Sequence, residues 1–202
     1  MRALPVLILS CAILTSCGKS DSGSGPGGGA GASAAKEGGD TPQAVFDRAK
    51  SAIAKKDNAD FFVCIAPADR DMAVFMFMFM GGMSTMGNAD AKKEYEALLK
   101  KHGVPEQKEG EGPDMNDKAK MKEALAKMYA NVKDKKALFV ELCAFTDKHA
   151  KDKDTMLGAD TSLKDVKEEG NTAKGKIAKK DGKESPIEFA KQDGRWFMVL
   201  DD

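Results

Sequence analysis

Two spacings of apolar residues divide the chain. Between residues 41 and 153 apolar side chains recur every three or four positions, which is the spacing of one face of an α-helix. From residue 162 to 202 they alternate with polar ones and are interrupted by Asp-Gly pairs at 181–182 and 193–194, a pattern typical of strands joined by tight turns. This order predicts an α+β fold, with N-terminal helices packed on a C-terminal curved antiparallel sheet of three to four strands.

Local signals indicate where helices begin and end. Thr41 followed by Pro42 is typical of a helix start, because the threonine can cap the first turn and proline suits the first helical position. Gly103 is a usual helix terminator. We expect helices that begin at 42 and that cover about 58–66, 69–80, 88–103, 116–132 and 135–151.

The stretch MAVFMFMFMGGMSTMG, residues 72–87, holds six of the chain's 12 methionines and three of its 10 phenylalanines. Because nearly every position is apolar, periodicity cannot separate a helix from a strand here. Its length and its helical neighbours favour a buried helix that breaks at Gly81-Gly82. At about 15 residues, the stretch is shorter than the roughly 20 that a membrane-spanning helix needs.

Three interpretations of this stretch stay open. Its side chains can belong to the core, or they can line a deformable apolar groove for a lipid or a protein partner, because methionine adapts to many shapes. The groove residues would be Phe75, Met76, Phe79, Met80 and Met83. The minor alternative is Cu(I) binding by thioethers on one helix face, from Met72, Met76 and Met80 or from Met76, Met80 and Met83.

The N-terminus has the layout of a secretion signal: Arg2, an apolar run over 3–14, and then small residues. The end of that run, Leu-Thr-Ser-Cys at 14–17, resembles the lipobox of bacterial lipoproteins. The resemblance implies that residues 1–16 are a signal peptide and that a lipidated Cys17 anchors the protein in a membrane. Gly18 and Lys19 lack the Asp that marks inner-membrane retention in enteric bacteria, which favours the periplasmic face of the outer membrane.

Composition separates a tether from a folded part. Residues 17–40 are rich in Gly, Ser and Ala, which predicts a flexible linker with a root-mean-square reach of about 25 to 30 Å. Residues 41–202 have the size of a single domain, with helices over 41–153 and a sheet over 162–202. The formal net charge is +0, and lysines alternate with acidic residues, which predicts a solvated surface and no nucleic-acid partner.

Two stretches near the ends of the domain resemble a known superfamily. They are TPQAVFDRAKSAIAKKDNADFFVCIAPADRD, from Thr41, and GNTAKGKIAKKDGKESPIEFAKQDGRWFMVLD, from Gly170. They are similar to the nuclear transport factor two and ketosteroid isomerase superfamily, and within it to bacterial lipoproteins of unknown function. The resemblance implies a cone-like fold of helices against a curved sheet, often with a concave pocket, and a helical insertion over about 72–160.

Catalytic chemistry finds little support in the residues. Ketosteroid isomerase chemistry needs an Asp base beside a phenol in a dry pocket, whereas Tyr95 and Tyr129 fall in the inserted helices and match no family position. No Cys-x-x-Cys, glycine-rich phosphate loop or helical histidine pair occurs, so no catalytic residue, metal site or cofactor is assigned. The sequence favours a non-catalytic binding or scaffold domain for an apolar ligand or an envelope protein. The alternative is an isomerase or hydrolase of the superfamily.

Two pairs of residues remain as candidates. Cys64 and Cys143 would stay unlipidated in an oxidising compartment, where they can form a disulfide or remain two buried thiols, and both alternatives are open. His102 and His149 each lie among lysines near a predicted helix end, where positive charge interacts favourably with the helix dipole.

Replacing Cys17 tests the anchor. Cys17→Ser removes the thiol that would be acylated, so we expect the variant in the soluble periplasmic fraction or as an uncleaved precursor. Metabolic labelling with a fatty acid and membrane fractionation measure this outcome. Label that is still incorporated into the variant would contradict the lipobox interpretation.

Overall fold

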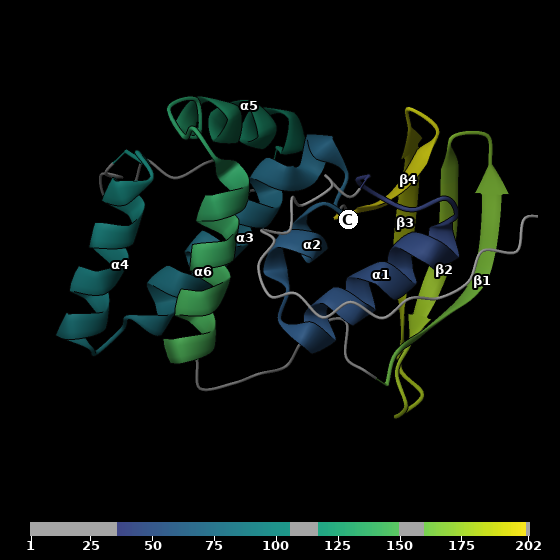
Figure 1. Ribbon diagram of the computed structural model, residues 1–202, viewed down its shortest axis with the longest axis horizontal. Coiled ribbons are helices and arrows are strands. Elements are labelled where there is room, and N and C mark those ends of the chain that lie inside the picture. The colour runs from purple at the N-terminus through teal and green to yellow at the C-terminus, as the bar shows by residue number, and fades with distance from the viewer. Residues whose placement is uncertain (1–35, 106–116, 150–159, 201–202) are drawn as a thin grey trace, which may run out of the picture. The chain divides into compact units, whose positions relative to one another are not determined.

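The computed structural model describes residues 36–105, 117–149 and 160–200, which belong to one compact unit, Lys36–Asp202. Helices come first and a four-stranded antiparallel sheet follows, which confirms the predicted α+β class (Figure 1). The elements are α1 (Pro42–Lys55), α2 (Asn58–Phe62), η1 (Pro67–Asp69), α3 (Arg70–Ser84), α4 (Ala89–Lys101), α5 (Lys118–Met128), α6 (Lys135–His149), β1 (Ser162–Glu169), β2 (Thr172–Ala178), β3 (Glu184–Gln192) and β4 (Arg195–Val199). Within these ranges, none of the helices combines the length and the apolar content that crossing a bilayer requires.

The sheet is a meander in which each strand pairs with the next, in the order β1-β2-β3-β4, and it does not close. Asp193 and Gly194 join β3 to β4 with φ angles of 50° and 78°, the left-handed conformation that a two-residue hairpin turn needs. The edge strand β1 has an irregularity between Lys164 and Lys167, where Asp165 has a φ of 53°. Such bulges make an edge a poorer template for other strands.

Helix α1 buries one face of the sheet. Thr41 caps α1 by accepting a hydrogen bond from the Ala44 amide at 3.0 Å, as its sequence predicted. The other face is polar, with ion pairs such as Lys174 to Glu188 at 2.6 Å. The residues buried between α1 and the sheet form the sheet cluster: Val45, Phe46, Ala49, Cys64, Ala173, Ile177, Ile187, Phe189, Trp196 and Met198.

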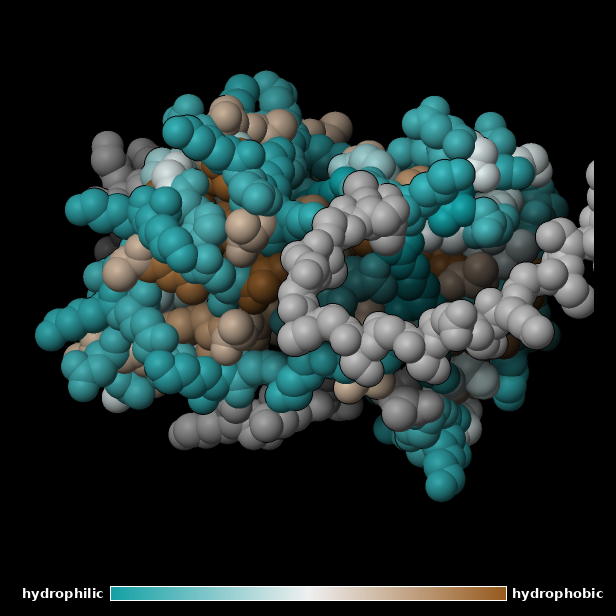
Figure 2. All heavy atoms as spheres, viewed as in Figure 1, coloured by the Kyte–Doolittle hydropathy of each residue, from teal (hydrophilic) through white to brown (hydrophobic). Residues whose placement is uncertain are grey.

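The other helices pack around a second group, the helical cluster. Phe139 of α6 contacts Phe62 and Phe77, with ring centroids 5.0 and 4.9 Å apart. Phe61 packs against both clusters and so links them. The helical cluster comprises Phe62, Ile65, Ala73, Val74, Phe75, Met78, Val104, Leu125, Tyr129, Val132, Leu138, Phe139, Leu142 and Cys143. On the face shown in Figure 2, hydrophilic side chains cover most of the coloured surface, in line with the predicted solvated exterior.

Three helices end elsewhere than predicted. The helix expected over 116–132 ends at Met128, after which the amides of Ala130 and Val132 bond to carbonyl oxygens only three residues back. The helix expected over 58–66 stops at Phe62, because the next residues hydrogen-bond to β4: Met198 donates to the Cys64 carbonyl at 2.9 Å and accepts from the Ala66 amide at 2.8 Å. The helix expected to break at Gly81-Gly82 continues to Ser84. A Cβ on Gly81 would lie 2.9 Å from the Tyr95 ring, so this glycine permits close packing of α4 and does not end α3.

Residues 36–40, the leading segment, lie along the edge of β4. Gly39 and Trp196 exchange both backbone hydrogen bonds, each 2.8 Å long. Gly38 has a φ of 67°, and a Cβ there would lie 2.5 Å from the Trp196 carbonyl oxygen, so the position requires glycine. The predicted linker therefore gives way to packed structure at 36 and not at 41. The predicted signal peptide, Cys17 and the linker up to residue 35 lie outside the described residues.

Arg48 of α1 binds the leading segment from one side. Its guanidinium donates to the carbonyl oxygens of Lys36 at 2.6 Å and Gly38 at 2.8 Å. The same group forms an ion pair with Asp60 of α2 at 2.6 Å. One side chain therefore joins the leading segment, α1 and α2.

Two more arginines bind the same segment. Arg195 of β4 donates to the carbonyl oxygens of Glu37 at 3.0 Å and Gly38 at 3.1 Å, and it pairs with Asp40. Arg70 of α3 pairs with the Glu37 carboxylate at 2.6 Å. Apart from Arg2, these three are the arginines of the chain, and all of them converge on one short stretch of backbone.

Arg48→Met tests this arrangement. It keeps an apolar side chain of similar reach but removes every donor, which leaves Asp60 and two carbonyls without this partner. We expect the free energy of unfolding to fall by about 1.5 to 3 kcal/mol, the range for hydrogen bonds to charged groups. Urea unfolding measures it.

Lys92→Met is the matched control. Lys92 is 68% exposed in an i,i+4 pair with Glu96 at 3.9 Å, so the change should be below about 0.5 kcal/mol. Equally small losses in both variants would show that the arginine contacts contribute little to stability.

Candidate binding surface on helix α3

Helix α3 exposes a row of long apolar side chains on one side. Residues 76, 79, 80 and 83 follow the i, i+3, i+4, i+7 spacing of a single helix face, and residue 86 follows just after the helix. We call this row the exposed strip: Met76, Phe79, Met80, Met83 and Met86, which are 43%, 60%, 39%, 51% and 77% exposed. Among the described residues, only Val166 of β1 joins them as an exposed large apolar side chain.

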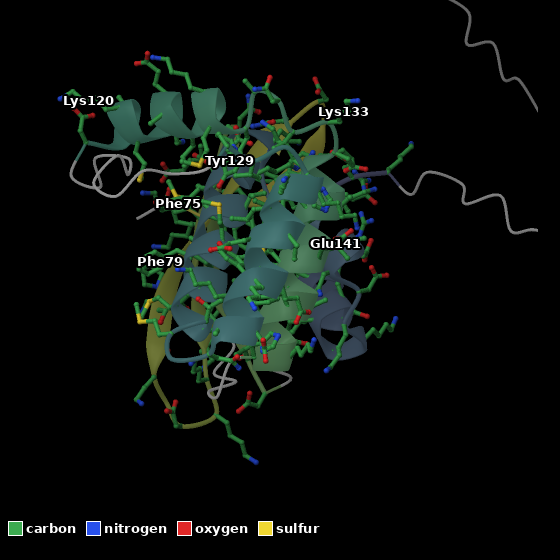
Figure 3. The ribbon with its side chains drawn as sticks, turned by 90° about the vertical axis from the view of Figure 1, so that its left-hand side faces the viewer. Phe75, Phe79, Lys120, Tyr129, Lys133 and Glu141 are labelled. Carbon is green, nitrogen blue, oxygen red and sulfur yellow. The ribbon has the colours of Figure 1, made fainter. Side chains whose placement is uncertain are left out.

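The opposite side of α3 is fixed in the core. Val74, Phe75 and Met78 are buried there. The Tyr95 hydroxyl of α4 donates to the Met78 carbonyl oxygen at 2.5 Å, and its ring lies against Gly81. Figure 3 places Phe79 at the outer margin of the helical part, on the other side from Glu141 of α6. The orientation of α3, and with it the exposure of the strip, is therefore set by contacts on its far side.

A second tyrosine, Tyr129, also contacts Met78. The Tyr129 hydroxyl lies 3.8 Å from the Met78 sulfur, and burial raises the pKa of both Tyr129 and Tyr95 well above the usual tyrosine value. Both hydroxyls are thus neutral donors to groups of the core. They act as packing and positioning groups for α3.

The start of α3 is held by two ion pairs. The buried carboxylate of Asp69 lies 3.1 Å from the Lys122 ammonium of α5. Asp71 pairs with Lys135 of α6 at 2.7 Å. Charge is present only at this end of the helix: from Met72 to Gly87 the sequence contains no Asp, Glu, Lys or Arg. A partner that covers the strip therefore finds no charge on α3 to pair with.

The groove predicted from the sequence wrongly includes Phe75 and lacks Met86. Phe75 is only 8% exposed and belongs to the helical cluster, so it does not line a surface. Met76, Phe79, Met80 and Met83 lie together as their spacing predicted. Met86 was not predicted, although it lies seven residues after Phe79 and so continues the same row.

The two cysteines are free and lie in different clusters. The Cys64 thiol donates to the Asp60 carbonyl oxygen at 3.2 Å and belongs to the sheet cluster, whereas Cys143 belongs to the helical cluster. Burial raises the pKa of Cys64 to about 12 and raises that of Cys143 as well. Of the two alternatives, the structure therefore contradicts the disulfide and has two buried, protonated thiols.

The histidines join α4 and α6, which run antiparallel. His102 lies 3.2 Å from Glu141, which Lys101 also contacts at 2.6 Å. At the other end Glu94 lies 2.8 Å from Lys148 and 3.2 Å from His149. Hydrogen bonds from the lysines are the main cause that lowers the pKa of both carboxyl groups, and the neighbouring histidines lower it further. These contacts attach α4 to α6, and α4 in turn positions Tyr95.

The described parts of the chain contain no group of three His, Cys, Asp or Glu side chains that could hold a metal ion.

A hollow of about 290 Å³ lies away from the strip, beside the leading segment. Five of its seven lining residues are polar or charged, and none is a methionine or a tyrosine: Lys36, Glu37, Pro67, Gln192, Asp193, Arg195 and Phe197. Its arginine already binds Asp40 and two carbonyl oxygens. This hollow has the composition neither of an apolar ligand pocket nor of an acid-base site around a phenol.

Substitution of two phenylalanines that lie two residues apart tests which face of α3 is buried. Phe77 packs edge-on against Phe139, so Phe77→Ala should cost about 3 kcal/mol of unfolding free energy. Phe79 is 60% exposed, so Phe79→Ala should change it by less than about 0.5 kcal/mol. Thermal and urea unfolding compare the two, and equal losses would show that the exposed strip is part of the core.

Comparisons with known proteins add no relative. No protein family, no curated protein and no solved structure matches this chain. The similarity to the nuclear transport factor two superfamily therefore stays a prediction from two stretches of sequence. The candidate site rests on the geometry of α3.

Proposed function

We propose that the chain is a lipid-anchored protein of the bacterial cell envelope, held by Cys17 at the periplasmic face of the outer membrane. Its folded unit is a non-catalytic binding or scaffold domain that engages an apolar target through the exposed strip. The observation that carries the domain's role is the strip itself, a row of five apolar side chains on a stretch without charge. The anchor rests on the N-terminal sequence.

The size of the strip supports a functional role. With roughly 200 Å² for a fully exposed side chain of this size, the five together expose on the order of 500 Å². Scattered single apolar residues need no explanation, but a contiguous patch of about 300 to 600 Å² on a monomer is often a binding surface. Polar residues at Phe79, Met83 and Met86, each more than half exposed, would serve the fold equally well, because the packing of α3 comes from its other side.

The side-chain chemistry favours binding over catalysis. Four of the five strip residues are methionines, whose flexible thioethers adapt to different partner shapes. Acid-base catalysis needs a titratable group that can reach a substrate. The phenols of Tyr95 and Tyr129 instead point at the backbone and sulfur of Met78. We therefore place the function of the domain on its surface.

Binding of an apolar fluorescent dye tests the strip. The double variant Phe79→Gln, Met83→Gln should lose most of the dye fluorescence seen with the parent protein. Its unfolding free energy should stay within about 0.5 to 1 kcal/mol of the parent, because both side chains are exposed. Val166→Gln is the control, since Val166 is 37% exposed outside the strip. A parent protein that binds no dye, or an equal loss in the control, would contradict the proposed surface.

A further inference from the structure

We infer that the target of the exposed strip is the membrane surface itself. The strip would lie in the boundary between headgroups and acyl chains of the bilayer to which Cys17 is attached, so that the domain rests on the membrane and does not swing freely above it. This inference rests on the proposed lipid anchor. It assigns the strip a bilayer in place of a second copy of the chain or another envelope protein.

The shape of the strip favours a bilayer over a second copy. The strip is a single line of side chains along one helix, whereas a specific protein interface surrounds a compact apolar centre with a polar rim. A bilayer requires no complementary shape.

The distribution of charge fits a bilayer boundary. An interfacial helix places its apolar side chains about 5 to 10 Å into this boundary, and a charged side chain on that face would have to be desolvated. Residues 72–87 carry no charge. The carboxylates at the start of α3, Asp69 and Asp71, are paired with Lys122 and Lys135. The strip can therefore enter the boundary without burying an unpaired charge from its own helix.

The anchor makes a small contact sufficient. With packed structure beginning at Lys36, a linker of 18 residues of this composition would reach about 21 to 25 Å, so attachment at Cys17 would keep the leading segment that close to the bilayer. Tethering of this kind raises the effective concentration of the second contact into the millimolar range. A contact that would be too weak for the free protein then becomes populated.

Methionine oxidation provides a direct test, because the strip carries its own reporters. Hydrogen peroxide converts accessible methionines to sulfoxides, and mass spectrometry measures the rate at each position. The chain from Cys17 onward is coupled through the Cys17 thiol to a maleimide lipid in vesicles of phosphatidylethanolamine and phosphatidylglycerol. Cys64 and Cys143 are buried and do not compete. Met78 and Met198, 6% and 2% exposed, are internal references.

We expect oxidation of Met76, Met80 and Met83 to slow at least about fivefold on coupling to vesicles, with Met78 and Met198 unchanged. The slowing should not depend on the number of chains per vesicle, and the uncoupled chain mixed with vesicles should show much less. Phe79→Gln should weaken the protection of Met76 and Met80, whereas Val166→Gln should not. Both positions are exposed, so both variants should remain folded.

Two outcomes would overturn the inference. Protection that rises with chain density on the vesicles, or with protein concentration in their absence, would assign the strip to a second copy. Rates that stay equal with and without vesicles would assign it to a different partner. Because coupling is chemical, neither outcome bears on acylation in the cell, which the Cys17→Ser labelling experiment tests separately.

Discussion

The hydrogen bonds along the edge of β4 hold the two halves of the fold together. Met198 bonds to the segment after α2, at Cys64 and Ala66, and Trp196 bonds to Gly39 of the leading segment. Without these contacts α1 could still cover the sheet, but the helical cluster would be joined to it mainly through Phe61 and the ion pair of Arg48 with Asp60. The same contacts occupy an edge strand that would otherwise be free to pair with other chains. One short strand thus sets the position of α2 and, through it, the start of α3.

Local chemistry allowed much of this fold to be predicted. Thr41-Pro42 and Asp193-Gly194 fix their backbone through their own side chains and φ angles, and both lie where the sequence placed them. Two of the wrong helix ends were decided by distant residues. The backbone after Phe62 forms hydrogen bonds with β4, and Gly81 leaves room for the ring of Tyr95 from α4. No local pattern reports such contacts.

The candidate site shows the same division. The helical spacing predicted which side chains share a face, so Met76, Phe79, Met80 and Met83 could be grouped from the sequence. It could not predict which face is buried, because a uniformly apolar helix has no polar face that identifies the solvent side. Phe75 was therefore placed in the groove by mistake, although it lies against the helical cluster. The separation of Cys64 and Cys143 likewise depends on packing that spacing does not encode.

The convergence of three arginines on the leading segment has a mechanical consequence. Any force transmitted along the N-terminal part of the chain enters the fold at Lys36. There it meets guanidinium contacts from α1 and β4, and the neighbouring Glu37 is held from α3 as well, before it reaches the sheet ladder. The load is thus spread over elements from both clusters, and no single hairpin carries it alone. A domain built in this way resists being opened from Lys36 when the N-terminal part of the chain is pulled.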